Sequence, residues 1–309
     1  MKSGNWTILA SLCLMVAATA ACAADSAAPP AAPAAGAADA PGKTAGPAAP
    51  TFEEVMKDPN RKVGFIRKTL KLDDGTEPIY QVWVPLDYAA GKKWPVILFL
   101  HGKGESGTDG EKILVQGLPK EIKKRDGKFE FIVVIPQSAS GAAMTVPSKD
   151  APKAGEKGPA GPAAPPWPRG GWVGADEEFA IKALQVTERE YATDPVRVYL
   201  TGLSMGGFGT WRLAANHPTL FAALVPICGG GDPSKAATFA HIPTWVWHGD
   251  ADKTVPPDLS RKMVEALKAA GAKEVKYTEL PGVGHNSWDQ AYASDELWTW
   301  LLAHRRTAK

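Results

Sequence analysis

Ser204 lies within the motif Gly-Leu-Ser-Met-Gly at residues 202–206, which follows a β-branched, aromatic stretch at 196–200 and precedes a helix-like stretch at 208–217. A G-x-S-x-G motif between a strand and a helix is typical of a nucleophile elbow, a sharp turn that exposes the serine hydroxyl. The N-terminus of the following helix favours negative charge near that hydroxyl. The motif therefore predicts a nucleophilic serine, and the elbow geometry makes the backbone N–H of Met205 one donor of an oxyanion hole.

A serine hydroxyl is a weak nucleophile and needs a base that is oriented by a carboxylate. An apolar, strand-like stretch at residues 242–247 leads into the acidic turn His-Gly-Asp-Ala-Asp, and a later strand-like stretch leads into a glycine-rich loop with His285. Chemistry in open parallel sheets takes place at the carboxyl ends of the strands. We therefore expect Ser204 and His285 at one sheet edge. The acid is one of the two aspartates of the turn, Asp250 or Asp252.

The other histidines have simpler interpretations. His101 and His248 each precede a glycine at the end of a predicted strand and are expected to hold loops by hydrogen bonds. His217 ends the helix after the elbow, where the helix dipole favours it, and His241 lies in a loop. This leaves His285 as the predicted base.

No metal, cofactor or nucleic-acid partner is predicted. The sequence contains no H-E-x-x-H and no paired C-x-x-C, and its acidic turn lacks the spacing of an EF-hand. The glycine-rich loop at residues 102–107 lacks the G-K-[ST] ending of a phosphate-binding loop. The net charge of +2 does not indicate a partner that carries many phosphates.

Three motifs, at residues 202–207, 248–252 and 282–285, resemble the phospholipase/carboxylesterase and prolyl-oligopeptidase-like branch of the α/β-hydrolases. More narrowly, they are similar to secreted bacterial hydrolases labelled "predicted peptidase". The resemblance covers about residues 60–305. It implies that the second aspartate of the acidic turn, Asp252, is the acid of a catalytic triad.

The same resemblance implies the second oxyanion-hole donor, the backbone N–H of Lys103, which follows a His-Gly pair. Asp250, the rival acid, is expected to cap its own turn through its side chain. Glu105 has two interpretations. Either it braces this loop or lines the substrate pocket, or it is a solvated loop charge.

The alternation of strand-like and helix-like stretches predicts an α/β-hydrolase fold, with a mostly parallel central sheet and helices on both faces. The stretches at 63–72 and 80–84 are expected to open the sheet as an antiparallel pair. The further predicted strands are residues 94–100, 131–136, 196–200, 221–227, 242–247 and 275–280, and the predicted helices are 176–191, 208–217, 259–270 and 296–304.

Residues 1–22 predict a signal peptide, because a positive charge precedes an apolar stretch too short and too alanine-rich for a stable membrane span. Residues 19–22 resemble a bacterial lipobox, so Cys22 is a candidate for lipidation and membrane tethering; the alternative is cleavage that releases a soluble protein. Residues 23–50 predict a disordered Ala/Pro-rich linker, and 51–309 one α/β domain. We therefore expect export, as an outer-membrane lipoprotein or a periplasmic or extracellular protein.

Residues 138–171 form a Pro/Gly/Ala-rich stretch without periodicity, longer than a usual connecting loop. It is either a flexible flap that shapes the substrate site or a disordered insertion. Trp172 and Trp288 are candidate substrate-binding residues, with packing in the core or a loop as the alternative. Cys228 ends a buried strand and is expected to be a small core residue, not a nucleophile of the kind found in dienelactone hydrolases.

Together these features predict a serine carboxylesterase that forms an acyl-enzyme on Ser204, with short-chain acyl esters or acetyl and feruloyl esters of polysaccharides as candidate substrates. An ester leaving group needs less protonation than an amine, and no β-propeller precedes the predicted domain, which favours an esterase over a peptidase. A serine peptidase of the prolyl-oligopeptidase-like type and a non-catalytic hydrolase-fold binding protein remain as alternatives. The oligomeric state is not predicted.

Overall fold

The computed structural model describes residues 50–139 and 172–306. The predicted signal peptide, nearly all of the predicted linker and nearly all of the predicted insertion at 138–171 lie outside these residues. Among the described helices, none has both the length and the apolar composition needed to cross a bilayer.

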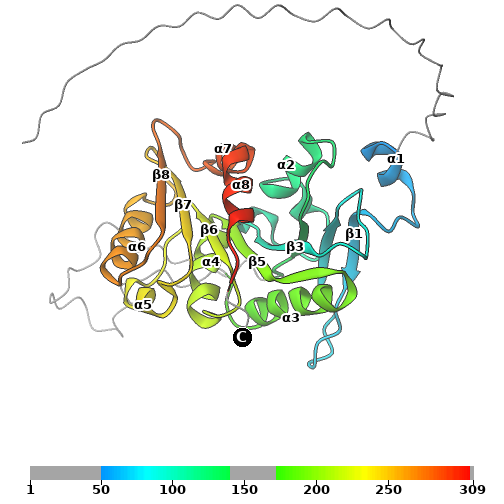
Figure 1. Ribbon diagram of the computed structural model, residues 1–309, viewed down its shortest axis with the longest axis horizontal. Coiled ribbons are helices and arrows are strands. Elements are labelled where there is room, and N and C mark those ends of the chain that lie inside the picture. The colour runs from blue at the N-terminus through cyan, green and yellow to red at the C-terminus, as the bar shows by residue number, and fades with distance from the viewer. Residues whose placement is uncertain (1–49, 140–171, 307–309) are drawn as a thin grey trace, which may run out of the picture. The chain divides into compact units, whose positions relative to one another are not determined.

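The central sheet has eight strands in the order β1-β2-β4-β3-β5-β6-β7-β8 (Figure 1). The strands are β1 Gly64–Thr69, β2 Ile79–Val84, β3 Trp94–Leu100, β4 Ile132–Pro136, β5 Thr193–Leu203, β6 Ala223–Ile227, β7 Thr244–Gly249 and β8 Val275–Leu280. Strand β2 runs antiparallel to both β1 and β4, and all other neighbours are parallel. The predicted α/β fold with a mostly parallel sheet is confirmed, and so is the antiparallel opening pair.

The helices include four that the sequence predicts, α3, α4, α6 and α8, with small offsets at their ends. The helices are α1 Phe52–Lys57, α2 Leu118–Lys124, α3 Ala175–Glu190, α4 Met205–Asn216, α5 Ala236–Phe239, α6 Asp258–Ala269, α7 Trp288–Ala293 and α8 Asp295–Ala303, with 3-10 turns η1 Lys103–Glu105, η2 Lys112–Leu114 and η3 Pro233–Lys235. The sequence does not predict α1, α2, α5 and α7. These helices are too short for their apolar residues to show the repeat of 3.6 residues by which a helix is recognised in a sequence.

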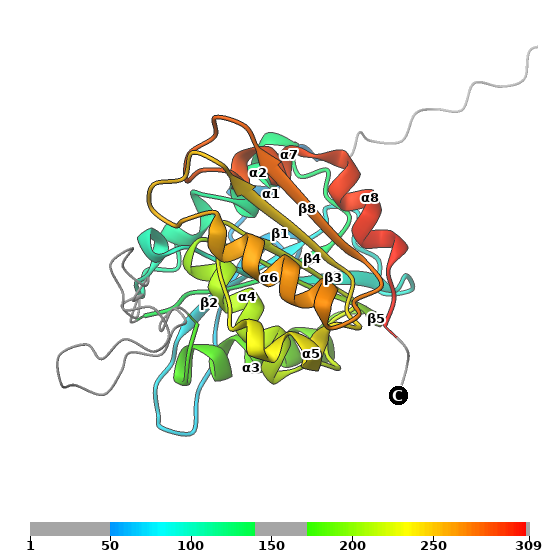
Figure 2. The same cartoon turned by 90° about the vertical axis from the view of Figure 1, so that its left-hand side faces the viewer.

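Each face of the sheet packs against its own set of helices (Figure 2). Along β3, Leu98 belongs to the core that α3, α4, α5 and α6 cover, whereas Ile97 and Phe99 belong to the core of α2, α7 and α8. Side chains alternate between the two faces of a strand, so a strand covered on both faces reads as a continuous apolar run. All seven residues of β3 are buried, and the central strands form a rigid base for the loops at their carboxyl ends.

The parallel strands β5, β6, β7 and β8 are neighbours and end at the same edge of the sheet. Ser204 follows β5 directly, Asp252 lies in the turn after β7, and His285 lies in the loop after β8. The sheet order therefore places these three chain segments side by side.

Candidate active site

Ser204 occupies a strained turn between β5 and α4. Its φ of 52° and ψ of −115° are unusual for a residue with a side chain. The turn fits only because its glycines lack side chains. A Cβ on Gly206 would overlap the carbonyl oxygen of Leu100, and a Cβ on Gly202 would overlap the carbonyl of Gly206. The glycines of the motif are therefore required by steric contact with the backbone of the elbow and of β3.

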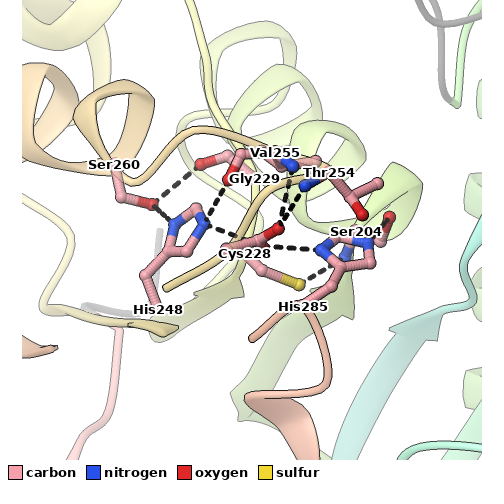
Figure 3. A network of polar contacts seen from close by, with 9 residues as sticks. Ser204, Cys228, Gly229, His248, Thr254, Val255, Ser260 and His285 are labelled. Carbon is pink, nitrogen blue, oxygen red and sulfur yellow. Dashed lines mark hydrogen bonds and ion pairs between the residues drawn. The ribbon is translucent and has the colours of Figure 1, made fainter. Parts of the chain in front are cut away.

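The three predicted triad side chains form one hydrogen-bonded chain (Figure 3). His285 Nε2 lies 2.8 Å from Ser204 Oγ, and His285 Nδ1 lies 2.6 Å from Asp252 Oδ2. Because the carboxylate accepts from Nδ1–H, the lone pair of Nε2 faces the serine hydroxyl proton. This geometry allows the imidazole to take that proton when the oxygen attacks.

The structure places Asp252, and not Asp250, against His285. Asp250 is exposed, and its Oδ1 accepts a hydrogen bond of 2.7 Å from the backbone N–H of Gly282. Its side chain therefore links the acidic turn to the loop that carries His285. The sequence predicts a cap of its own turn, whereas this hydrogen bond comes from a different loop.

Asp252 is buried and still ionised. Burial by itself would raise the pKa of the carboxyl, but hydrogen bonds from His248, His285 and the backbone of Val255 outweigh it and hold the pKa well below its usual range. The other carboxylate oxygen, Oδ1, accepts the N–H groups of Thr254 at 2.8 Å and Val255 at 2.9 Å. The negative charge stays fixed where it can stabilise an imidazolium at His285.

Each of the two predicted oxyanion-hole donors is the N–H of the first residue of a helical segment. Met205 is the first residue of α4 and Lys103 the first of η1, and N–H groups at such positions have no acceptor within their helix. The end of β3 packs closely on the elbow, since a Cβ on Gly102 would lie 2.8 Å from Leu203 Cδ1. The donors therefore belong to loops held in mutual contact.

His101 and Trp172 fix the loop that carries Lys103. The His101 ring is buried, accepts the N–H of Ser138 at Nε2 (3.0 Å), and lies 2.6 Å from the Gly102 oxygen through Nδ1. These partners require a neutral ring with its proton on Nδ1, and burial lowers the pKa of His101 to about 4. His101 thus holds a loop, as predicted.

Trp172 is not a substrate-binding residue. Its side chain is fully buried, its Nε1 donates to the His101 oxygen at 3.2 Å, and its ring meets the His101 ring edge-on at 4.9 Å. The prediction for Trp172 is therefore wrong, and its alternative, packing in the core, is what the structure shows.

Glu105 and Trp288 are both half-buried at the site. Burial raises the pKa of Glu105, while hydrogen bonds to its carboxylate from the backbone of Gly102 and of Glu105 itself act in the opposite direction. Glu105 therefore braces its loop. Trp288 packs its ring edge-on against His285, with centroids 5.3 Å apart. A substrate contact of Trp288 stays a prediction.

His248 and Cys228 are two neighbours of the triad whose contacts sequence reasoning missed. His248 Nε2 lies 3.2 Å from Asp252 Oδ2, and Cys228 Sγ accepts the Ser204 N–H at 3.2 Å. His248 and Asp252 are four residues apart in the sequence. That spacing brings two side chains together in a helix, but it does not do so across the end of a strand. The path of the turn decides the contact.

Cys228, Asp252 and His285 form a cluster whose potential ligand atoms lie within 4.8 Å of one another. Asp252 and His285 already share a hydrogen bond, and His285 shares a second one with Ser204. Burial raises the pKa of the Cys228 thiol, which keeps it protonated and a poor metal ligand. The cluster fits a proton relay, with Cys228 as a core residue behind it.

Comparisons with known proteins agree on one kind of hydrolase. The chain is 32% identical over 125 residues to poly(3-hydroxyalkanoate) depolymerase C of Paucimonas lemoignei, covering 30% of each chain. It is 24% identical over 215 residues to carboxylesterase SOBER1 of Arabidopsis thaliana, covering 65% of this chain and 88% of that protein. The crystal structure of a thermostable esterase superposes with a TM-score of 0.60 at 33% identity, covering 78% of this chain and 63% of that chain.

The chain thus spans less than two thirds of both the depolymerase and the thermostable esterase. The family model Esterase ("Putative esterase") matches residues 75–300, a range that contains the elbow, the acidic turn and His285. With this match over most of the described residues, and with the fold and the site geometry above, the chain belongs to the Esterase family.

Proposed function

We propose that the protein is a serine carboxylesterase. The observation that carries this proposal is the hydrogen-bonded chain from Ser204 Oγ through His285 to Asp252, with distances of 2.8 and 2.6 Å. Met205 and Lys103 each begin a helical turn, and N–H groups at such positions are available to bind a tetrahedral oxyanion. Membership of the Esterase family and the carboxylesterase relative support the same reaction.

The reaction proceeds in two halves. Ser204 Oγ attacks the ester carbonyl carbon while His285 Nε2 takes its proton, and the N–H groups of Met205 and Lys103 bind the oxyanion. His285 then gives the proton to the departing alcohol, which leaves an acyl group on Ser204. Water, deprotonated by His285, repeats the attack and releases the acid. Asp252 stabilises the imidazolium in both halves.

An ester series tests this function. We expect the full-length protein to hydrolyse p-nitrophenyl esters from acetyl to dodecanoyl, and a fluorophosphonate to label Ser204 and abolish turnover. The comparison of chain lengths gives the acyl preference directly. Labelling without ester turnover, together with cleavage of peptide p-nitroanilides, would identify a peptidase instead. Absence of both activities and of labelling would contradict catalysis.

The substrates we propose are esters of extracellular polymers or of short acyl chains. Two observations support this: the relative described as a poly(3-hydroxyalkanoate) depolymerase, and the signal-like N-terminus with Cys22. Trp288, half-buried beside His285, offers an aromatic surface for an acyl or sugar ring.

We also propose that the protein is exported and tethered through a lipidated Cys22. The apolar segment followed by a lipobox-like sequence supports this. Mass spectrometry of the mature protein is expected to find Cys22 as the N-terminal residue, with added acyl mass. An unmodified N-terminus at or near residue 23 would instead support release as a soluble protein. An intact Met1 would contradict export.

A further inference from the structure

The loop that follows β3, residues 101–110, carries the second predicted oxyanion donor, Lys103, at the start of the 3-10 turn η1. The segment after β4 holds this loop. The Gly107 N–H donates to the Ser138 carbonyl oxygen at 2.9 Å, and the Ser138 N–H donates to the His101 ring at 3.0 Å. The position of the loop is therefore set by contacts with the end of β4.

Gln137, the residue that follows β4, binds the same loop with its side-chain amide. Its Oε1 accepts the N–H of Gly110 at 2.6 Å, and its Nε2 donates to the Glu105 carbonyl oxygen at 3.0 Å and to Asp109 Oδ1 at 3.3 Å. A backbone N–H only donates and the two oxygens accept, so these partners fix the orientation of the amide. Gln137 is 2% exposed, so the loss of any of these bonds leaves a buried polar group unpaired.

A second buried glutamine holds Gly110 from the neighbouring strand. Gln81 of β2 donates from Nε2 to the Gly110 carbonyl oxygen at 3.0 Å. Gln81 pairs with Ile135 of β4, two residues before Gln137, so both glutamines belong to one face of the sheet. Gly110 has a φ of 74°, and a Cβ there would lie 2.7 Å from Arg67 Nη1. The end of the loop is thus enclosed and bound at both its N–H and its carbonyl.

We propose that Gln137 is a positioning residue for the oxyanion hole, an inference that rests on the proposed function. The turn η1 begins with Lys103, whose N–H is the donor, and ends with Glu105, whose carbonyl oxygen is bound by Gln137. The turn moves as a unit, since the Ser106 N–H donates to the Lys103 oxygen at 3.2 Å. By fixing the end of the turn, Gln137 fixes the place of the donor at its start.

The expected effect is on the transition state. Oxyanion donors stabilise the charge that develops during attack, and loss of one donor costs about 10²–10³ in kcat in a comparable serine hydrolase. A displaced donor loses part of this stabilisation, whereas the substrate before attack needs it much less. Loosening of the turn should therefore lower kcat and leave KM nearly unchanged.

Gln137→Glu tests this role, because it keeps the size of the side chain and an acceptor oxygen but its ionised carboxyl cannot donate to Glu105. The new carboxylate would also face Asp109, which is ionised because the backbone N–H groups of Lys112 and Glu111 lower its pKa to about 2. We expect kcat/KM for the best p-nitrophenyl ester to fall by about ten- to a hundred-fold, with little change in KM.

The readout that separates positioning from a loss of folded protein is the Ki of a trifluoromethyl ketone. Ser204 Oγ adds to the ketone carbon, the carbonyl oxygen becomes the oxyanion, and His285 takes the proton. The Ki should rise by the same factor as kcat/KM falls. Fewer intact sites would lower the apparent kcat but would leave Ki unchanged. A folded Gln137→Glu protein with wild-type kcat/KM and Ki would overturn the proposal.

Two control variants make the comparison specific. Gln185→Glu is the same substitution at an exposed position on α3, and it should change neither kcat/KM nor Ki. Thr187→Val removes a buried hydroxyl that donates to the Ala183 oxygen at 2.9 Å within α3. It should lower the unfolding temperature and leave Ki unchanged.

Gln81→Met is the second variant in case the change at position 137 prevents folding. It removes the hydrogen bond to the Gly110 carbonyl and keeps the length of the side chain. We expect kcat/KM to fall and Ki to rise together, by a smaller factor than in Gln137→Glu. A folded Gln81→Met protein in which both are unchanged would contradict anchoring of the loop from this end.

Hydrogen exchange measured by mass spectrometry tests the anchoring without any assay of activity. Peptides that cover residues 103–112 are expected to exchange several-fold faster in Gln137→Glu than in the wild type or in Gln185→Glu. Unchanged exchange would overturn the proposal, even if the wild type hydrolyses esters. Faster exchange in a protein whose wild type neither hydrolyses esters nor reacts with the fluorophosphonate would contradict only the proposed function.

Discussion

Replacing Ser204 with alanine is expected to lower kcat/KM for esters by about four to six decades. The substitution removes the attacking oxygen, which lies 2.8 Å from His285 Nε2. The remaining rate would come from the oxyanion donors and substrate binding alone. Initial rates on the best p-nitrophenyl ester, measured with thermal unfolding of the same preparation, check this result.

Ser234→Ala is the matched control, because Ser234 is an exposed serine in η3. It should keep wild-type activity. The Ser204 variant should unfold at a temperature close to that of the wild type, since no buried packing is lost. A Ser204→Ala protein that is folded and retains a substantial part of the activity would show that another group is the nucleophile.

Replacing Asp252 with asparagine is expected to lower kcat by about three to four decades. An amide can present its NH₂ group to His285 Nδ1, which favours the tautomer with the proton on Nε2 and directs it at the serine. The change also removes the charge that stabilises the imidazolium. Asparagine at position 250 should have a small effect, because its side-chain oxygen can still accept the Gly282 N–H.

The pair of variants decides between the two aspartates that the sequence left open. Both are assayed for kcat and KM on one ester, with the fluorophosphonate-labelled fraction as the measure of intact sites. If Asp250→Asn costs more than Asp252→Asn, Asp252 is not the acid. Equal large losses would indicate that the whole turn after β7 has been displaced.

The sequence predicts best where a single physical signal is strong. The run of apolar residues at 94–100 gives β3 with its observed bounds, because a strand covered on both faces is apolar throughout. The run at 275–280 gives β8 with its observed bounds by a different signal, the alternation of apolar and polar residues. Ser204 and His285 are found because the elbow and the glycine-rich loop are local motifs with a known chain order.

The sequence fails where a residue's role depends on contacts between distant segments. Trp172 follows a Pro/Gly-rich stretch, so the sequence leaves both substrate binding and core packing open; it is buried because it packs on His101, which comes from another loop. Likewise, His248 reads as a simple loop anchor. Its contact with Asp252 depends on the path of the turn, and its second partner, Ser260, comes from α6.

The strained backbone of Ser204 has a consequence for attempts to make this protein more heat-resistant. Glycine adopts a φ of 52° with a ψ of −115° far more easily than serine does, so glycine at position 204 would relieve strain of about 1–3 kcal/mol. A directed-evolution screen that rewards only survival at high temperature would therefore favour loss of the nucleophile. Selection for thermal tolerance in this family member has to be coupled to turnover at every round.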